Sequence, residues 1–323
     1  MRYLVTGAAG FIGSHYVRML LGGELDVEVS KVTVVDKLTY AGDKRNLESV
    51  MDDQRFEFVQ GDICDSKLVR DLMSDMDVVV NFAAESHVDR SISDASSFVR
   101  TNVLGAQVVF DAARDAGVAR VVHIGTDEVY GSIESGSWNE KSPLQPNSPY
   151  AASKAAAEHF MHAYAHTYGL NISSTRCSNN YGPHQFPEKL VPLFVTNLLD
   201  RQQLPMYGDG LNTRDWLHVS DHCRGIQIVV SKGDAGQSYN IGGGRELTNR
   251  QLTEMIIHKM HRDWDCVEYV PDRLGHDRRY SVDDALIRSL GYSPQVNFDS
   301  GLDQTIEWYV NNESWWRKHK SDG

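Results

Sequence analysis

Residues 2–13 read "RYLVTGAAGFIG", an apolar run followed at once by Gly7, Gly10 and Gly13. These glycines let the chain turn tightly, so that backbone N–H groups and the start of a helix can approach a pyrophosphate, whose charge the helix dipole favours. The helix would continue through "FIGSHYVRMLLGG", residues 11–23. The stretch therefore predicts a strand, a glycine-rich turn and a helix, the opening unit of a dinucleotide-binding fold.

The first half of the chain repeats this rhythm of a short β-branched run followed by a polar or glycine-rich break. The runs are residues 31–36, 56–62, 77–84 and 119–126, and residues 171–179 look like a further strand. Strands that alternate with helical stretches predict an α/β fold with a parallel, doubly wound sheet of the Rossmann type.

Two carboxylates near the glycine-rich turn indicate which dinucleotide binds. Asp36 closes the second predicted strand, where a carboxylate accepts hydrogen bonds from an adenosine ribose and repels a 2′-phosphate, so NAD is favoured over NADP. Asp62 follows the third predicted strand and could lie against the adenine, although an Asp in that place is as often a helix cap.

The later part of the chain is less regular. Segments such as residues 204–219 and 238–249 are rich in glycine and turn residues. We expect residues 1–178 to form mainly an NAD-binding Rossmann domain, and residues 179–323 mainly a smaller α/β substrate-binding domain with some segments returning to the first. The two regions are expected to pack closely around a ligand cleft.

Composition narrows the class of protein. With 44 acidic and 32 basic residues the formal charge is -12, which argues against a nucleic-acid surface and an anionic membrane as partners. We see no apolar run long enough for a membrane span and no signal peptide. Cysteines 64, 177, 223 and 266 lie far apart, and the histidines show no ligand spacing, so neither disulfides nor a metal site is predicted. A reducing cytoplasm is the expected compartment.

"GTDEVYG", residues 125–131, places two carboxylates directly after an apolar run. Asp127 and Glu128 could form an ordinary solvated turn or an acid and a base. Because neighbouring side chains on a straight strand point to opposite faces, the second possibility requires the backbone to turn at residues 126–128 and aim both at one substrate. Burial and mutual repulsion would then drive the two pKa values apart.

"YAASK", residues 150–154, follows Ser148 and Pro149, which are typical of a helix cap and first helical residue. Tyr150 and Lys154 would share a helix face, and the lysine ammonium is expected to lower the pKa of the phenol, giving a base for alcohol oxidation. With Thr126 hydrogen-bonding the oxidised oxygen, these residues predict a dehydrogenase triad. An incidental Tyr and Lys on a helix is the alternative.

Through "TGAAGFIG" (6–13), "YAASK" and "NNYGP" (179–183), the chain resembles the extended short-chain dehydrogenase/reductase family over nearly its whole length. Further segments are similar to the dTDP-glucose 4,6-dehydratases of that family: "DKLTYAG" (36–42), "FAAESHVDRSI" (82–92), "GTDEVYG", "NNYGPHQFPEKLVPL" (179–193), "YGDGLNTRDW" (207–216) and "GHDRRY" (275–280). The sequence departs from the family pattern at Ala9 and at Cys177-Ser178.

The resemblance implies a lyase that acts on dTDP-glucose. Tyr150 would take the C4 hydroxyl proton while hydride passes to NAD, Glu128 would remove the C5 proton, and Asp127 would protonate the departing C6 hydroxyl. The hydride then returns to C6, so NAD would stay bound through turnover. By the same resemblance, a homodimer would form through helices near residues 96–116 and 150–168.

Motif matching also proposes the ligand contacts. The cofactor would contact Gly7, Gly10, Phe11, Ile12, Gly13, Asp36, Lys37, Leu38, Thr39, Asp62, Ile63, Phe82, Ala83, Ala84, Ser86, Thr101, Tyr150, Lys154 and Asn180. The substrate would contact Ser86, Thr126, Asn179, Lys189, Leu190, Pro205, Met206, Tyr207, Arg214, Asn249, Arg273, His276 and Asp277. Within the second set, residues 205–207 would line the nucleobase and Arg214 would face the diphosphate.

Other functions of the same fold stay open. By the same resemblance, a UDP-glucose 4,6-dehydratase carries a similar acidic pair, whereas 4-epimerases generally lack it. Decarboxylases and GDP-mannose dehydratases usually keep the glutamate but have Ser in place of the aspartate. A non-catalytic NAD-sensing scaffold would be expected to lose Tyr150, Lys154 or the acidic pair, all of which are present. Asp127 is therefore the residue that separates the favoured function from its nearest relatives.

Overall fold

The computed structural model describes residues 1–321; the last two residues of the second predicted region, 322–323, lie outside the described part. Its main sheet is parallel throughout, with the strand order β10-β6-β5-β4-β1-β2-β3. The strands are β1 (Arg2–Thr6), β2 (Lys31–Asp36), β3 (Phe56–Gln60), β4 (Val78–Asn81), β5 (Arg120–Thr126), β6 (Ile172–Cys177) and β10 (Ser238–Ile241). The predicted strands and the doubly wound Rossmann-type fold are confirmed.

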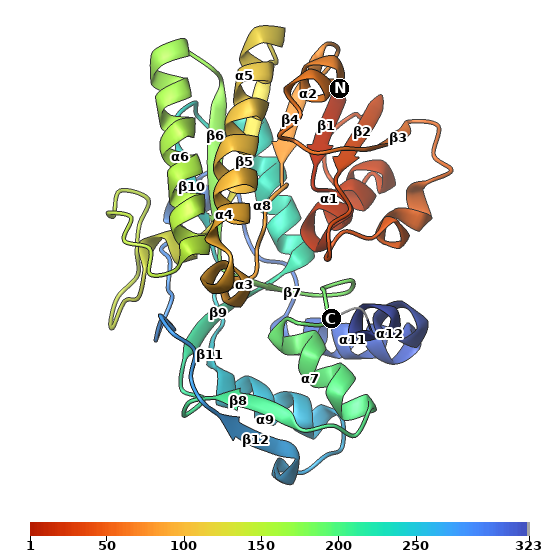
Figure 1. Ribbon diagram of the computed structural model, residues 1–323, viewed down its shortest axis with the longest axis vertical. Helices are drawn as coiled ribbons and strands as arrows, with labels where there is room; N and C mark the ends of the chain where they lie inside the picture. The colour runs from red at the N-terminus through yellow and green to blue at the C-terminus, as the bar shows by residue number, and fades with distance from the viewer. Residues whose placement is uncertain (322–323) are drawn as a thin grey trace.

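Helices cover both faces of this sheet because its strands are apolar on both sides. Tyr3 and Val5 of β1 pack into one apolar layer and Leu4 between them packs into the other. The first layer contains α1 (Phe11–Gly22), η1 (Lys44–Val50), α8 (Val219–Lys232) and α10 (Ala285–Ser289), and the second contains α2 (Ser66–Met73), α5 (Ala106–Ala116) and α6 (Pro149–Tyr168) (Figure 1).

Short helical segments fill the connections at the carboxyl end of the sheet. Between β4 and α5 the chain forms α3 (Val88–Ser93), α4 (Ala95–Phe98) and the π-helical turn η2 (Val99–Gly105). The 3-10 turn η3 (Asp127–Tyr130) directly follows β5. These connections stand where ligands bind in open α/β sheets.

A second body of structure lies beyond the carboxyl end of the main sheet (Figure 1). Its core contains Phe194, Trp216 and Leu302, among other apolar side chains. Its elements are β7 (Asn179–Tyr181), α7 (Leu190–Leu199), β8 (Leu204–Tyr207), β9 (Thr213–His218), β11 (Glu246–Thr248), α9 (Asn249–Lys259), η4 (Trp264–Cys266), β12 (Val267–Val270), α11 (Phe298–Asn311) and α12 (Glu313–Ser321).

Three segments that follow residue 178 return to the main sheet or to its first apolar layer, namely β10, α8 and α10. Strand β10 pairs with β6, and helix α8 packs against α1 in the first apolar layer. The small sheets β11-β9-β7 and β12-β8 lie in the second body. Within residues 1–321, no helix combines the length and apolar character needed to cross a membrane.

Candidate active site

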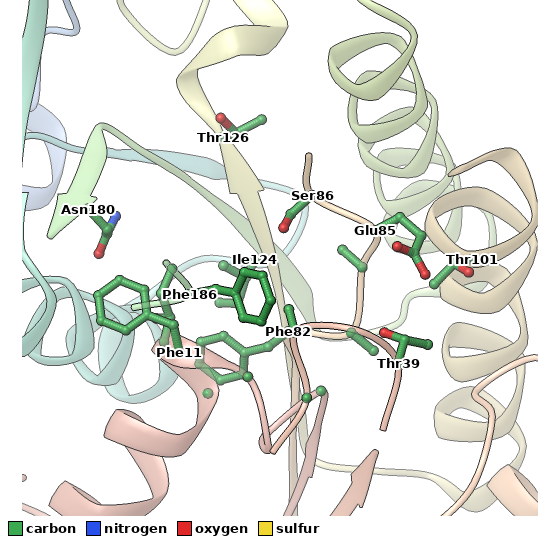
Figure 2. Close-up of a pocket in the computed structure, with 18 of the residues that line it drawn as sticks. Phe11, Thr39, Phe82, Glu85, Ser86, Thr101, Ile124, Thr126, Asn180 and Phe186 are labelled. Atoms are coloured by element: carbon green, nitrogen blue, oxygen red, sulfur yellow. The ribbon is translucent and has the colours of Figure 1, made fainter. Parts of the chain in front are cut away.

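A cavity of about 320 Å³ opens at the carboxyl ends of β1, β2, β4, β5 and β6. Its lining includes residues 179, 180 and 185–189, which follow β6, so the predicted cleft between the earlier and later parts of the chain is present. Figure 2 shows Thr126 at the end of a strand, Asn180 across the cavity from Ser86, and Thr39, Glu85 and Thr101 together at another side.

The glycine-rich turn brings bare backbone to the cavity wall. Gly7 has a φ of +66°, and a Cβ there would lie 2.6 Å from the backbone N and Cα of Ala83. A Cβ on Gly13 would lie 2.7 Å from the Gly7 carbonyl oxygen. Gly10 caps helix α1 without a side-chain hydrogen bond, so the helix start is open toward the cavity. This cradle fits a dinucleotide pyrophosphate.

Asp36 lies beside the cradle at the end of β2. Its Oδ2 accepts a hydrogen bond from the Ala9 N–H at 2.9 Å, and its Oδ1 accepts one from the Leu38 N–H at 2.8 Å. Burial raises the pKa of this carboxyl despite both bonds. Each oxygen keeps a free lone pair, so the carboxylate can accept the two hydroxyl groups of a ribose.

The alternative cap role of Asp62 is wrong. Helix α2 is capped by Asp65, whose Oδ1 accepts from the N–H groups of Lys67 and Leu68. Asp62 instead lines the cavity, with its Oδ2 2.9 Å from Lys37 Nζ. Its Oδ1 accepts from the Cys64 N–H at 2.9 Å, and the adenine contact of Asp62 stays a prediction.

The backbone turns sharply at the acidic pair, as the catalytic interpretation requires. Strand β5 ends at Thr126, whose Oγ1 accepts a hydrogen bond from the Glu128 N–H at 3.3 Å and so caps η3. Asp127 and Glu128 form the first turn of η3, and both line the same cavity. The predicted turn is confirmed, and the solvated-turn alternative is wrong because the Asp127 side chain is buried.

The two carboxyls have different electrostatic surroundings. Burial, then the nearby charges of Glu128 and Asp215, raise the pKa of Asp127 well above its usual value. Burial also raises the pKa of Glu128, but the cations of Arg273, Arg214 and Lys189 oppose that shift. The pKa of both carboxyls is thus raised, that of Asp127 well above its usual value, while three cations oppose the shift at Glu128. This asymmetry is the one expected for an acid and a base.

Tyr150 and Lys154 lie on the first two turns of α6. The Ser148 Oγ accepts from the Ala151 N–H at 3.1 Å and Pro149 is the first helical residue, so the predicted helix start is confirmed. Lys154 Nζ donates to the Ile124 carbonyl oxygen at 2.5 Å, and burial lowers its pKa to about 8.

The expectation that Lys154 lowers the pKa of the Tyr150 phenol is wrong for the protein alone. Burial, followed by the Glu128 charge, raises the pKa of Tyr150 well above its usual value, and the Thr126 hydroxyl only partly opposes this. Lys154 Nζ donates its hydrogen bond to the Ile124 carbonyl oxygen, and the largest influences on the phenol are burial and the Glu128 charge.

The residues that motif matching assigned to the cofactor line this cavity, apart from Leu38. Leu38 has a positive φ of 57° and contributes its N–H to Asp36 instead. The lining residues among them are Gly7, Gly10, Phe11, Ile12, Gly13, Asp36, Lys37, Thr39, Asp62, Ile63, Phe82, Ala83, Ala84, Ser86, Thr101, Tyr150, Lys154 and Asn180.

The residues assigned to the substrate divide into two groups. Ser86, Thr126, Asn179 and Lys189 line the cavity. The others, here called the outer group, do not line the cavity: Leu190, Pro205, Met206, Tyr207, Arg214, Asn249, Arg273, His276 and Asp277.

Several residues of the outer group contact one another. The guanidinium of Arg214 lies 4.3 Å from the ring centre of Tyr280 and donates to the Asp277 carbonyl oxygen at 2.9 Å. The rings of Tyr207 and His276 meet edge to face at 6.3 Å. Arg273 Nη1 is 3.9 Å from Asp89. Because Arg214 and Arg273 also act on the charge of Glu128, this group borders the acidic pair.

Sequence reasoning missed part of the lining: Val35, Ala41, Gly42, Gly61, Ile124, Gly125, Cys177, Ser178, Gln185, Phe186 and Glu188. Several of them adjoin predicted residues at strand ends, so the rule that ligands bind at the carboxyl ends of parallel strands could have found Gly61, Gly125 and Cys177. Phe186 and Glu188 belong to a loop whose path depends on tertiary packing.

Comparisons with known proteins agree with this geometry. The family model described as GDP-mannose 4,6 dehydratase matches residues 4–305. A dTDP-glucose 4,6-dehydratase from Streptomyces niveus is 56% identical, over 99% of this chain and 96% of that protein. The crystal structure of DesIV, a dTDP-glucose 4,6-dehydratase from Streptomyces venezuelae with NAD and TYD bound, is 58% identical and superposes with a TM-score of 0.98, over 99% of this chain and 100% of that one.

A relative of different activity shares the fold. A UDP-glucose 4-epimerase from Thermotoga maritima, solved with UDP-glucose, is 30% identical with a TM-score of 0.89, over 97% of this chain and 100% of that one. The architecture therefore does not by itself choose between dehydration and epimerisation.

Proposed function

This chain belongs to the family described as GDP-mannose 4,6 dehydratase, and from that membership we propose that it is a dTDP-glucose 4,6-dehydratase. It is an NAD-dependent lyase that converts dTDP-glucose to dTDP-4-keto-6-deoxyglucose. The thymidine nucleotide is preferred to the guanosine nucleotide of the family description because relatives 54% to 56% identical, over 97% or more of this chain, carry the dTDP-glucose name.

The observation that carries the proposal is the acidic pair, with Asp127 buried and Glu128 partly buried, facing the same cavity as Tyr150. A dehydrogenase or an epimerase needs only the Tyr150 side of this arrangement. Removing water from C5 and C6 needs a base and an acid in addition, and Glu128 and Asp127 have the burial and the charge environment for those two roles.

The redox residues stand at the end of β5 and the start of α6. Because burial raises the pKa of Tyr150, its phenolate would form only against opposing positive charge, which Lys154 and an oxidised nicotinamide would supply. The phenolate then takes the proton of the C4 hydroxyl, and Thr126 holds the C4 oxygen. NAD, when bound against the glycine cradle and Asp36, supplies the hydride acceptor and later the hydride donor. Lys154 anchors the helix start to β5 through the Ile124 carbonyl and keeps a positive charge near the phenol as the proton moves.

The elimination residues act on the neighbouring carbons. Once C4 is a ketone, the C5 proton is acidic. The carboxylate of Glu128 removes this proton, and the positive charges of Arg214, Arg273 and Lys189 favour that carboxylate. Asp127, which burial keeps protonated, gives its proton to the C6 hydroxyl as it departs as water. As hydride returns to C6, Glu128 gives its proton back to C5. Asp127 then takes up one proton and Tyr150 releases the proton it took from the C4 hydroxyl, so that all three groups are restored.

The outer group of residues would hold the rest of the nucleotide sugar. Arg214 has the permanent charge and the several donors that suit a diphosphate, and Tyr207 in β8 offers a half-exposed ring for a thymine. Asn179, Lys189 and Leu190 would meet the sugar, while Asn249 and residues 273–277 would close the nucleotide end.

Product analysis tests the function. Incubation of the purified protein with dTDP-glucose and NAD is expected to yield the 4-keto-6-deoxy sugar with no net formation of NADH, and to incorporate deuterium at C5 when run in D₂O. Formation of dTDP-galactose alone would identify an epimerase, the function that the shared fold makes second best. Parallel incubations with UDP-glucose and GDP-mannose measure the nucleotide preference.

A homodimer is part of the proposal. Val99, Leu104 and Phe160 are large apolar side chains left exposed on η2 and α6, in the ranges expected to pair with a second copy. Light scattering after gel filtration is expected to give twice the chain mass of 36.3 kDa. Cytoplasmic location is proposed as well, because Cys64, Cys177, Cys223 and Cys266 are free thiols, which fits a reducing compartment.

A further inference from the structure

Residues 182–189, here called the strap, run along the cavity between β7 and α7. Gln185, Phe186, Glu188 and Lys189 all line it. In Figure 2, Phe186 lies among Phe11 at the start of α1, Phe82 just after β4 and Ile124 in β5. The strap thus covers the region where the glycine cradle would hold a dinucleotide.

The strap is fastened to the loop that follows β2 and to the start of α3. The rings of Phe186 and Tyr40 meet edge to face at 5.5 Å, and the guanidinium of Arg90 lies 3.8 Å from the centre of the Tyr40 ring. Arg90 Nη2 is 3.5 Å from Glu188 Oε2. Lys189 Nζ donates to the Ser86 carbonyl oxygen at 3.2 Å. Aromatic, cation–π and ionic contacts therefore bridge one rim of the cavity to the other.

The C-terminal helix α12 supports the strap from behind. The His319 ring packs edge to face on Phe186 at 5.0 Å, and its Nε2 is 3.0 Å from Asp43 Oδ2. Trp315 Nε1 donates to Asn46 Oδ1 at 3.0 Å. Helix α12 thus contacts both the strap and the segment with Asp43 and Asn46. These contacts hold the strap next to the loop that follows β2.

We propose that the strap is a closed clasp that retains NAD between turnovers, with the Tyr40–Phe186 contact and the Arg90–Glu188 ion pair as its fastenings. This rests on the proposed function, in which hydride leaves C4 and returns to C6, so that the cofactor has no reason to exchange. An open cavity would let it escape while it is reduced. Tyr40, Arg90 and Glu188 are thus positioning residues for cofactor retention.

Tyr40 is the sharpest position to test because its side chain lies outside the cavity lining, whereas Phe186 lines it. The measurement is the rate at which the NAD-loaded protein exchanges its cofactor for isotope-labelled NAD. We expect Tyr40→Ala to raise this rate about tenfold, from the loss of one aromatic pair and one cation–π contact. Glu188→Gln, which breaks a partly exposed ion pair, is expected to raise it about threefold.

Controls separate the clasp from general loosening. Tyr269→Ala removes an exposed tyrosine of β12, and is expected to leave both the exchange rate and the thermal midpoint unchanged. Tyr40→Phe keeps the ring pair and is expected to exchange NAD within about twofold of the unaltered protein. The double variant Tyr40→Ala, Phe186→Ala is expected to exchange NAD at most about threefold faster than Phe186→Ala alone, because only the Arg90 cation–π contact is left to lose once the Phe186 ring is gone.

If Tyr40→Ala exchanges NAD at the rate of the unaltered protein, the clasp is wrong. The clasp is also wrong if the effects of Tyr40→Ala and Phe186→Ala on the exchange rate are fully additive, because Phe186 would then act only by contacting the cofactor directly. The proposed function is tested independently of the clasp. If the unaltered protein retains NAD and dehydrates dTDP-glucose while Tyr40→Ala does not change exchange, only the clasp is wrong. If the unaltered protein binds no NAD, the proposed function itself fails.

Discussion

At Gly7 and Gly13 the wall of the cavity is backbone, whereas around Asp127 and Glu128 it consists of buried charged side chains. The cofactor side depends on φ values and close backbone contacts, which a few residues in one turn determine. The acid–base side depends on charges brought together from several distant segments. One half of this site is therefore set by local geometry and the other by long-range electrostatics.

Glu128→Gln is expected to have the largest effect, because it removes the base without changing the shape of η3. Turnover should fall about 10³-fold, within the range of a lost general base. Oxidation at C4 should persist, visible as enzyme-bound NADH in a single turnover. Glu134→Gln, at an exposed glutamate six residues along, is the matched control and should turn over normally. Normal turnover in Glu128→Gln would remove the acid–base side from the mechanism.

Gly13→Ala tests the cofactor side in the same way. Its Cβ would press on the Gly7 carbonyl oxygen and the Ala8 Cα, both backbone atoms that cannot swing aside. We expect the free energy of unfolding to fall by about 2 kcal/mol, together with weaker NAD binding. Gly23→Ala is an instructive contrast, since nothing lies near its added Cβ and only its φ of +73° opposes the change. Unchanged NAD affinity in Gly13→Ala would show that the cradle is wider than the backbone contacts indicate.

This contrast also explains what the sequence could predict. The strands, the glycine turn, Asp36 and the Tyr150 helix were predicted because each is encoded within a few consecutive residues. Nothing local places Phe186 beside Tyr40, or Arg214 and Arg273 near Glu128. The raised pKa of Tyr150 was missed for the same reason, because burial is a property of the folded chain that a Tyr and Lys four residues apart does not reveal.

The outer group should separate binding from chemistry. Tyr207→Ala removes a half-exposed ring from β8 without touching the cavity lining. If the ring stacks on the thymine, KM for dTDP-glucose should rise about tenfold while kcat stays the same, since a stack worth roughly 1 to 1.5 kcal/mol is made equally before and during the reaction. NAD retention should not change. A fall in kcat with KM unchanged would instead mean that Tyr207 contributes to the chemical step and not to substrate binding.

The smallest expected effect is on the free energy of unfolding, through the buried carboxyl of Asp127. Burial, Glu128 and Asp215 raise the pKa of Asp127 above 3.8, its ordinary value. Below that value the carboxyl is protonated in both folded and unfolded chains and costs nothing. Above it the unfolded chain is ionised while the folded one must take up a proton, so this contribution makes stability fall as pH rises, up to the raised folded pKa.

Asp127→Asn cannot titrate, and should therefore gain stability over the unaltered protein as pH rises, by about 1 kcal/mol at about pH 8 and by nearly nothing at about pH 4. Denaturant unfolding at both pH values measures this difference. Asp209→Asn is the matched control, because Arg278 rather than burial dominates there and lowers the pKa of Asp209 to about 2, so that its loss should cost stability at neutral pH instead. A constant difference between Asp127→Asn and the unaltered protein across pH would mean that Asp127 is not held protonated by the fold, and the charge asymmetry that distinguishes the two sides of the site would lose its main support.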